Sequence, residues 1–386
     1  MPGVSFGDNG GMTSASHSSA AAEPFEGLRI RGVAKTFGAD TTVLNEIDLD
    51  VHPGELISLV GSSGTGKSTL LRIIAGLEEP SAGRVTYAGQ PLERGLVGVV
   101  FQRPILYPHL SVKDNILFPT RLGAFAGRVD MGYYRELLEA LKLEGLESRK
   151  PSQLSGGQAQ RVGIARALIR RAPVVLFDEP LASVDEEMSA SIRADIVRLH
   201  ERYGFTGLYV THDQNEALML GQRVAVMDAG YLVQVDTPER LLAHPHTLQV
   251  AKLLAAPALN LVALEDSAVL PAGCELAIRA TALCPVAADA AHSLPVQVLG
   301  SRHLVGGMLY RARLLEAVSL PLESGRASAD SELSARMYAR VRAGQELEFF
   351  IPDAHGGTSL SVGDRVHLGV AAERCFLFSK GKRFYL

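Results

Sequence analysis

The sequence predicts an α/β domain with a mostly parallel sheet, followed by a small all-β domain. Two observations predict the first domain: apolar runs such as 56–60 and 174–177 alternate with helical patterns, and a glycine-rich stretch, 61–68, directly follows the first run. Buried parallel strands are nearly continuous in apolar residues, and strands that alternate with helices indicate a sheet covered on both faces. The third observation, a change to short strand-like runs after Asn260, predicts the second domain.

Residues 43–51 alternate between apolar and polar, which predicts a half-exposed strand that ends at Pro53-Gly54. Buried strands and intervening helices then alternate. The expected strands are 56–60, 174–177 and 208–210, and the expected helices are 68–75, 133–142 and 158–170.

The second domain is expected to be a small antiparallel barrel whose strands are separated by Gly, Pro and Asp. These strands are 276–279, 296–299, 309–313, 346–351 and 365–370. The polar, serine-rich stretch 319–330 is interpreted as a flexible insertion. The first residues are rich in Gly, Ser and Ala and have too little apolar surface to order themselves. We therefore divide the chain into a disordered leader (1–26), an α/β domain (27–245) and an all-β domain (246–386).

The composition argues against several classes of protein. The 386 residues carry a formal net charge of −4, which does not favour nucleic acid as a partner. Three cysteines without close spacing fit neither a disulfide framework nor a zinc site, and they suit a reducing cytosol. The N-terminal stretch lacks the basic and apolar regions of a signal peptide, and no apolar run approaches the roughly 18 to 20 residues of a membrane helix. Any work at a membrane is expected to depend on other chains.

Residues 61–68, GSSGTGKS, match the phosphate-loop pattern G-x-x-x-x-G-K-[ST] in full, between an expected strand and an expected helix. Glycines let the backbone curl so that its N–H groups point at phosphate oxygens, and the following helix adds its positive N-terminal end. We expect Lys67 to neutralise the β- and γ-phosphates and Ser68 to bind Mg²⁺ through its hydroxyl. The alternative is a chance glycine-rich turn, and the complete match in the required setting argues against it.

Two further stretches carry weaker signals when each is taken alone. The strand 174–177 ends in Asp178 and Glu179, which suit a Mg²⁺ water shell and the activation of an attacking water, respectively. A solvated turn is the more common meaning of such a pair. The stretch 154–158, LSGGQ, precedes a helix, so Ser155 and the glycine N–H groups could form a second anion site. Its plain alternative is an N-cap serine on a flexible turn.

The stretch LSGGQ at 154–158 resembles the signature of the ABC ATPase family, and the other elements of that family stand in the expected order. These are the adenine-stacking aromatic Phe37, the Q-loop Gln102, the D-loop 181–185 and the switch histidine His212. The D-loop reads Ala-Ser-Val-Asp where Ser-Ala-Leu-Asp is more common. The resemblance implies an α/β P-loop NTPase fold in the first domain, an ABC cassette with a helical subdomain, and an OB-like transport-associated domain after it.

The resemblance also implies ATP and Mg²⁺ as ligands, and a head-to-tail dimer in which each copy completes the other's site. The residues implied to bind ATP are Phe37, Gly61, Ser62, Ser63, Gly64, Thr65, Gly66, Lys67, Ser68, Thr69, Ser155, Gly156, Gly157, Gln158 and Asp185. Those implied to bind Mg²⁺ are Ser68, Gln102 and Asp178. Those implied to act in catalysis are Glu179, His212 and Gln102.

Residues 100–120 resemble the corresponding stretch of sugar-importer ATPases, in which the part that matches residues 106–112 lies near the groove that receives the coupling helix of a permease. On composition alone, a solvated loop is the alternative. The layout is similar to that of maltose and glycerol-phosphate importer ATPases, and polyamine and ferric-iron importer ATPases share it. The resemblance implies ATP-driven uptake of a small solute, a sugar or sugar derivative, by a peripheral protein at the cytoplasmic face of the cell membrane. The implied partners are a second ATPase subunit, permease subunits and, indirectly, a solute-binding protein, with no nucleic acid.

Three other classes of function fit the sequence less well. A soluble ABC ATPase that acts on nucleic acid or ribosomes commonly has two cassettes or a basic arm, whereas this chain has one cassette and a negative net charge. A non-catalytic regulator is disfavoured by the intact Lys67, Asp178, Glu179 and His212. Exporter ATPases rarely have an OB-like tail. Residues 277–280 lack the Pro-Glu pair that is common after the arginine in sugar importers, and no residue specifies the transported solute.

Overall fold

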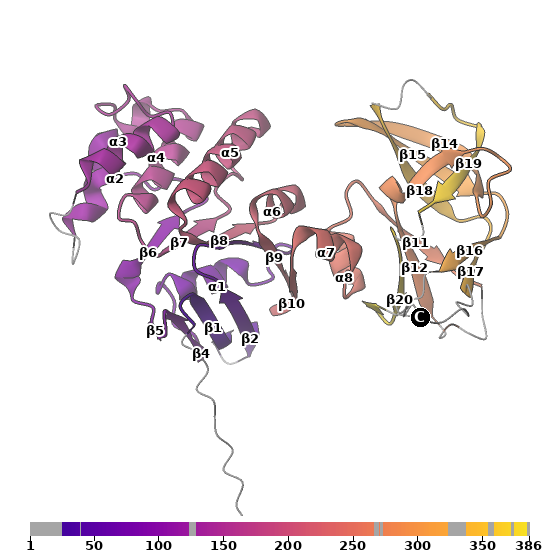
Figure 1. Cartoon of the computed structure of the whole chain (residues 1–386), viewed down its shortest axis with the longest axis horizontal. Coiled ribbons are helices and arrows are strands. Elements are labelled where there is room, and N and C mark those ends of the chain that lie inside the picture. The colour runs from indigo at the N-terminus through magenta and orange to yellow at the C-terminus, as the bar shows by residue number, and fades with distance from the viewer. Residues whose placement is uncertain are drawn as a thin grey trace, which may run out of the picture.

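The computed structural model describes residues 25–38, 40–122, 129–265, 270, 273–322, 337–353, 359–371 and 374–383. An α/β part and a β part are joined through the helices α7 and α8 (Figure 1). The predicted fold class is therefore confirmed: an α/β cassette precedes an all-β domain. The leader expected at 1–26 lies outside the described residues up to residue 24, and the bounds of the three predicted parts stay predictions. Among the described residues, no helix is long and apolar enough to cross a bilayer.

The central sheet of the cassette has six strands in the order β10-β9-β3-β8-β7-β6, parallel except for β10. In chain order these strands are β3 (Leu56–Val60), β6 (Val97–Val100), β7 (Val174–Asp178), β8 (Thr206–Thr211), β9 (Arg223–Asp228) and β10 (Tyr231–Asp236). All residues of β3 and β8 are buried. The three predicted buried strands are therefore central strands, and their carboxyl ends lie at one edge of the sheet.

A second, antiparallel sheet covers one face of the central sheet, with the strand order β2-β1-β4-β5. Its strands are β1 (Leu28–Phe37), β2 (Thr41–Val51), β4 (Ala82–Tyr87) and β5 (Gln90–Pro91). The apolar sides of β1 and β2 share one buried cluster with α1 (Lys67–Ile74) and with residues of β3, β7 and β8. The alternation at 43–51 therefore arises because β2 presents one face to this cluster.

Helices cover the opposite face of the central sheet. They are α2 (Val112–Leu117), α3 (Met131–Ala140), α4 (Gly156–Leu168), α5 (Glu186–Tyr203) and α6 (Gln214–Leu220). Short 3₁₀ turns lie at Arg94–Leu96, Phe118–Arg121 and Pro151–Gln153 in the cassette and at Ala280–Ala282 in the β part. The helices predicted near 68, 133 and 158 are confirmed. The α4 helix begins earlier than expected because Ser155 caps it: the Ser155 and Gln158 side chains each accept a hydrogen bond from the other's backbone N–H.

A buried carboxylate holds three of these helices together. The Asp195 side chain of α5 is fully buried, and its oxygens lie 2.9 Å from Nη2 of Arg161 on α4 and 3.6 Å from Nζ of Lys142 beside α3. Arg198 pairs with the same carboxylate. Because a buried charge without partners is costly, this cluster fixes α5 against the helix that carries the LSGGQ turn.

The described residues of the β part form three sheets. Its strands are β11 (Leu259–Ala263), β12 (Cys274–Arg279), β13 (Leu283–Val286), β14 (Leu294–Leu304), β15 (Gly307–Leu314), β16 (Val318–Leu322), β17 (Met337–Val341), β18 (Glu346–Pro352), β19 (Arg365–Val370), β20 (Cys375–Ser379) and β21 (Lys382–Arg383). They pair in the orders β13-β19-β14-β15-β18, β11-β12-β20-β21 and β16-β17 around one buried cluster. All five strand-like runs are confirmed.

One expectation in this part was wrong at its start. The stretch 319–330 was interpreted as a flexible insertion, but residues 319–322 belong to β16, which pairs with β17. Leu320 and Ala339 are buried there, so an apolar cross-strand contact stabilises the pair. Residues 323–330 lie outside the described part of the chain.

The linker helices α7 (Pro238–Ala243) and α8 (Leu248–Leu253) bind the two parts together. Leu248 and Ala251 of α8 pack with Ala277, Phe376 and Phe378 of the β part in one buried cluster. The backbone N–H of Leu248 also donates to the carbonyl of Gly381, over 2.8 Å. The linker is therefore integrated into the β part through both side chains and backbone.

Arg279, at the end of β12, secures the same junction. Its guanidinium is buried and donates to the Leu254 carbonyl (2.7 Å) and the Leu242 carbonyl (3.3 Å), near the ends of both linker helices. Burial lowers the pKa of Arg279 to about 10, so the group stays charged at neutral pH. The arginine thus satisfies carbonyls that have no partner within their own helix.

We expect Arg279→Met to lower the thermal unfolding midpoint and to destabilise the protein by about 2 kcal/mol or more, because two carbonyls lose a charged donor. The matched control is Arg302→Met, since Arg302 is largely exposed and forms only a surface ion pair with Glu348. Differential scanning calorimetry on both variants measures the effect. Equal midpoints for the two variants would show that Arg279 does not secure the junction.

Candidate phosphate-binding and catalytic site

The glycine-rich loop between β3 and α1 has the backbone shape that the sequence pattern requires. Gly64 and Gly66 adopt φ angles of 82° and 99°, a region that residues with a Cβ rarely occupy, and Gly66 caps α1. A Cβ on Gly61 would lie 2.3 Å from the Met227 carbonyl oxygen on β9. These three glycines therefore permit both the curl of the loop and its close packing on the sheet.

Lys67 is held inside this loop. Its side chain is buried, and Nζ donates to the carbonyls of Gly61 (2.8 Å) and Ser62 (2.9 Å). Burial lowers the pKa of Lys67, while the nearby charges of Glu179 and Asp178 oppose that shift. The ammonium is thus fixed in the concave loop, where a phosphate would meet it at the N-terminal end of α1.

Ser68 and Asp178 come together from different elements. Ser68 Oγ of α1 donates to Asp178 Oδ1 at the end of β7, over 3.2 Å. Burial raises the pKa of Asp178, and the hydrogen bond from Ser68 opposes that change. A hydroxyl and a carboxylate that converge beside a phosphate loop are oxygen donors of the kind that Mg²⁺ prefers, so these residues fit the expected metal.

Glu179 and His212 form a pair at the carboxyl ends of β7 and β8. His212 Nδ1 lies 2.9 Å from Glu179 Oε2. Glu179 has a φ angle of 44°, and its N–H donates to the Val210 carbonyl on β8. Such a conformation is costly for a residue with a side chain, and here it turns the carboxylate toward His212.

The LSGGQ turn stands apart from this cluster. Ser155 and Gly156 are exposed, whereas Gly157 is buried against Met188 of α5, whose Cγ would lie 2.6 Å from an added Cβ. Within the described chain, no hydrogen bond or ion pair joins residues 155–158 to residues 61–68. A single copy therefore leaves the two predicted anion sites separate.

The remaining predicted residues have mainly local contacts. Phe37 is 42% exposed, and Lys35 Nζ lies 4.8 Å from the centre of its ring. Gln102 is exposed and lies two residues after the end of β6. The carbonyl of the preceding residue, Phe101, accepts a hydrogen bond from the Gln160 side chain. Asp185 caps α5 by accepting from the Met188 N–H over 2.9 Å. Contact of these three residues with nucleotide stays a prediction.

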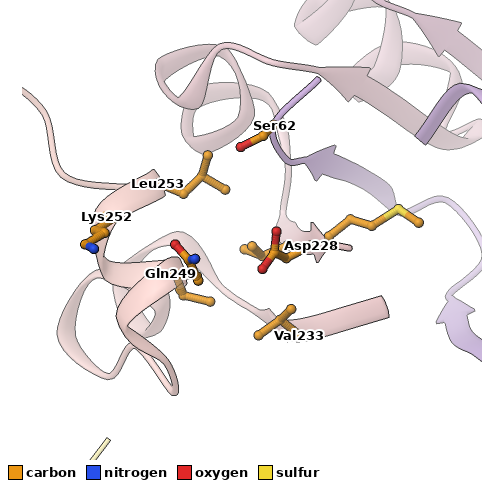
Figure 2. Close-up of a pocket in the computed structure, with 9 residues that line it drawn as sticks. Ser62, Asp228, Val233, Gln249, Lys252 and Leu253 are labelled. Carbon is orange, nitrogen blue, oxygen red and sulfur yellow. The ribbon is translucent and has the colours of Figure 1, made fainter. Parts of the chain in front are cut away.

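Sequence reasoning missed Glu216, which is buried on α6 four positions after His212 and accepts hydrogen bonds from Tyr209 and Thr211. The only available signal was a glutamate in the first turn of a helix capped by Asp213. It also missed a cavity of about 330 Å³ beside the phosphate loop. Figure 2 shows Ser62 on one side of this cavity and Gln249, Lys252 and Leu253 of α8 on another.

Comparisons with known proteins agree with this geometry. A sequence model of the family described as ABC transporter matches residues 44–182. The chain is 45% identical over 241 residues to the sn-glycerol-3-phosphate import ATP-binding protein UgpC 1 of Rhizobium johnstonii, covering 61% of this chain and 65% of that protein. It is 42% identical over 252 residues to UgpC of Yersinia pestis bv. Antiqua, covering 64% of this chain and 70% of that protein.

A solved structure is also similar. It is cbiO1 from Clostridium perfringens, described as part of the ABC transporter complex cbiONQ, with a TM-score of 0.52 and 26% identity, covering 57% of this chain and 92% of that one. The matches concentrate on the cassette, which holds the phosphate loop, the acidic pair and the LSGGQ turn. The chain therefore belongs to the ABC transporter family.

Proposed function

We propose that this chain is the ATPase subunit of an importer and that two copies enclose ATP between them. The observation that carries the proposal is the convergence of Lys67, the Ser68–Asp178 pair and the Glu179–His212 pair, while Ser155 and Gly156 of the LSGGQ turn are exposed and form no described hydrogen bond with them. An exposed anion site that its own chain leaves separate suits a phosphate held by a second copy. A twofold arrangement gives two such composite sites.

The reaction follows from these positions. The Glu179 carboxylate takes a proton from a water whose oxygen attacks the γ-phosphorus, and the bond from that phosphorus to the β–γ bridging oxygen breaks. His212 orients Glu179 and the water, and Lys67 offsets charge on the β- and γ-phosphates. Ser68 and Asp178, with Gln102 as a further ligand, would hold Mg²⁺, which would supply positive charge beside the phosphates. Closure with ATP and opening after hydrolysis supply the motion, because only a difference in affinity can shift such an equilibrium.

The relatives' names support a direction and a substrate. Both are named sn-glycerol-3-phosphate import ATP-binding proteins, so we propose uptake of sn-glycerol 3-phosphate or a related sugar derivative. The chain would then work as a peripheral protein on the cytoplasmic face, docked to permease subunits near residues 100–120 and served by a solute-binding protein. The β part is proposed to be a transport-associated regulatory domain.

Solute uptake by a strain from which the gene for this chain is deleted tests this proposal. Wild-type chain, supplied in trans, is expected to restore uptake of radiolabelled sn-glycerol 3-phosphate, and Lys67→Ala is expected not to restore it. Copurification of permease subunits with the tagged chain in detergent checks the partners. If the chain restores uptake of maltose or a polyamine but not of sn-glycerol 3-phosphate, the proposed substrate is rejected. The proposal that the chain serves an importer then still stands. A chain that hydrolyses ATP but never copurifies with a permease would reject the importer itself.

A further inference from the structure

Glu216 is a buried charged residue for which the proposed reaction has no direct use. It lies on α6, with a side chain 10% exposed. One carboxylate oxygen, Oε2, accepts hydrogen bonds from Thr211 Oγ1 (2.8 Å) and Tyr209 Oη (3.2 Å), both on β8. Burial, with the Glu216 charge, raises the pKa of Tyr209 well above its usual range, so Tyr209 remains a neutral donor.

These bonds hold the residues on both sides of His212. Thr211, directly before it, donates to Glu216 and accepts from the Asp213 N–H over 3.0 Å. Asp213, directly after it, accepts from the Glu216 N–H over 3.1 Å. The histidine side chain itself is 58% exposed, and its Nδ1 lies 2.9 Å from Glu179 Oε2. Its position toward Glu179 therefore depends on a backbone anchored through Glu216.

The second oxygen of Glu216 faces Arg193 of α5. Oε1 lies 3.5 Å from Nη1, and the arginine side chain is only 13% exposed. The other terminal nitrogen, Nη2, donates to Glu186 over 3.1 Å, in the first turn of α5 directly after Asp185. Asp195, two residues beyond Arg193, fixes α5 to Arg161 of the LSGGQ helix. Arg193 thus lies on a helix that is capped by the D-loop residue Asp185 and is fixed by Asp195 to the helix that carries the LSGGQ turn.

We infer that Arg193 and Glu216 are positioning residues for the switch histidine, and that their ion pair sets the placement of His212 from α5. The inference rests on the proposed ATP hydrolysis at Glu179 and His212. Neither residue touches the reacting atoms. Glu216 keeps its carboxylate oriented because Arg193 occupies one oxygen while Thr211 and Tyr209 occupy the other, so loss of the arginine frees the carboxylate and loosens the turn.

The test compares Arg193→Met in two backgrounds, the wild-type chain and the His212→Ala chain. In the wild-type background we expect kcat for ATP hydrolysis to fall roughly tenfold, because small displacements of a catalytic group are costly, while KM for ATP stays unchanged. In the His212→Ala background the same substitution should change the residual kcat less than about twofold, since residues that act as one unit are not additive. Release of radiolabelled phosphate is sensitive enough for both backgrounds.

Two further variants separate positioning from folding. Arg193→Lys keeps the charge and is expected to retain most of kcat. Arg202→Met is the matched control, because Arg202 lies on the same helix and pairs with Glu136, away from His212, and its kcat should equal that of the wild type. A merely structural role for Arg193 would lower activity equally in both backgrounds, and that result would overturn the inference.

The outcomes also distinguish this inference from the proposed function. If the wild-type chain hydrolyses ATP and Glu179→Gln does not, the proposed reaction stands; full kcat in Arg193→Met would then reject only the positioning role. If the wild-type chain does not hydrolyse ATP, alone or with permease, the proposed function fails, and the inference fails with it.

Discussion

Glu179→Gln is expected to reduce ATP hydrolysis by about 10²–10⁴-fold, the usual contribution of a general base, while nucleotide binding persists. The amide keeps nearly the same shape and can still reach His212, which lies 2.9 Å from Glu179 Oε2. It cannot accept the proton of the attacking water. ATP would therefore remain intact between two copies, and we expect a stable dimer by light scattering with ATP that dissociates when ATP is removed.

The matched control is Glu187→Gln, an exposed glutamate in the first turn of α5. It removes the same charge from the same chain and should leave hydrolysis unchanged. A Glu179→Gln chain that turns over ATP at the wild-type rate would exclude this carboxylate as the base. A chain that stays monomeric with ATP, even beside its permease, would exclude the shared site.

Lys67→Ala is expected to weaken ATP binding by at least roughly ten- to a hundredfold in Kd. A hydrogen bond to a charged group contributes about 1.5–3 kcal/mol, and each 1.4 kcal/mol is about tenfold in affinity. Lys67 already points into the loop through bonds to the Gly61 and Ser62 carbonyls, so little rearrangement is needed for its ammonium to meet phosphate. Isothermal titration with ATP and Mg²⁺ measures the change.

The control for this variant is Lys113→Ala, because Lys113 is exposed on α2 and far from the loop in sequence. Thermal unfolding without nucleotide checks that both variants fold. Unchanged ATP affinity in a folded Lys67→Ala protein would rule out its phosphate role. Equal losses in the two variants would point to a general charge effect.

The sequence predicted the cassette well because its signals are local. The continuous apolar runs became β3, β7 and β8 because a central parallel strand is buried on both faces. The β part was predicted less completely. β20 was missed because its run of apolar residues, CFLFS, does not alternate: the strand is buried on one side in the cluster of the β part and on the other against α8. β16 was missed because most of it lies in the polar stretch 319–330, which was interpreted as an insertion.

The candidate site likewise contains residues that a local motif predicts and residues that it does not. The loop glycines and Lys67 follow from one continuous pattern, and the structure places Lys67 within that loop. The pairing of Ser68 with Asp178, and of Glu179 with His212, joins residues distant in sequence and needed a known family for its prediction. Glu216 and Arg193 had no motif at all. Their meeting depends on how α5 and α6 pack, which periodicity within either helix does not reveal.

The place of β3 in the sheet has a consequence for biosynthesis. Leu56 pairs with Gly207, and Ile57 with Arg223, so the strand that precedes the phosphate loop acquires its neighbours only when much later residues have left the ribosome. Nucleotide bound at this loop would therefore stabilise, by mass action, the cassette in which β8 and β9 already flank β3.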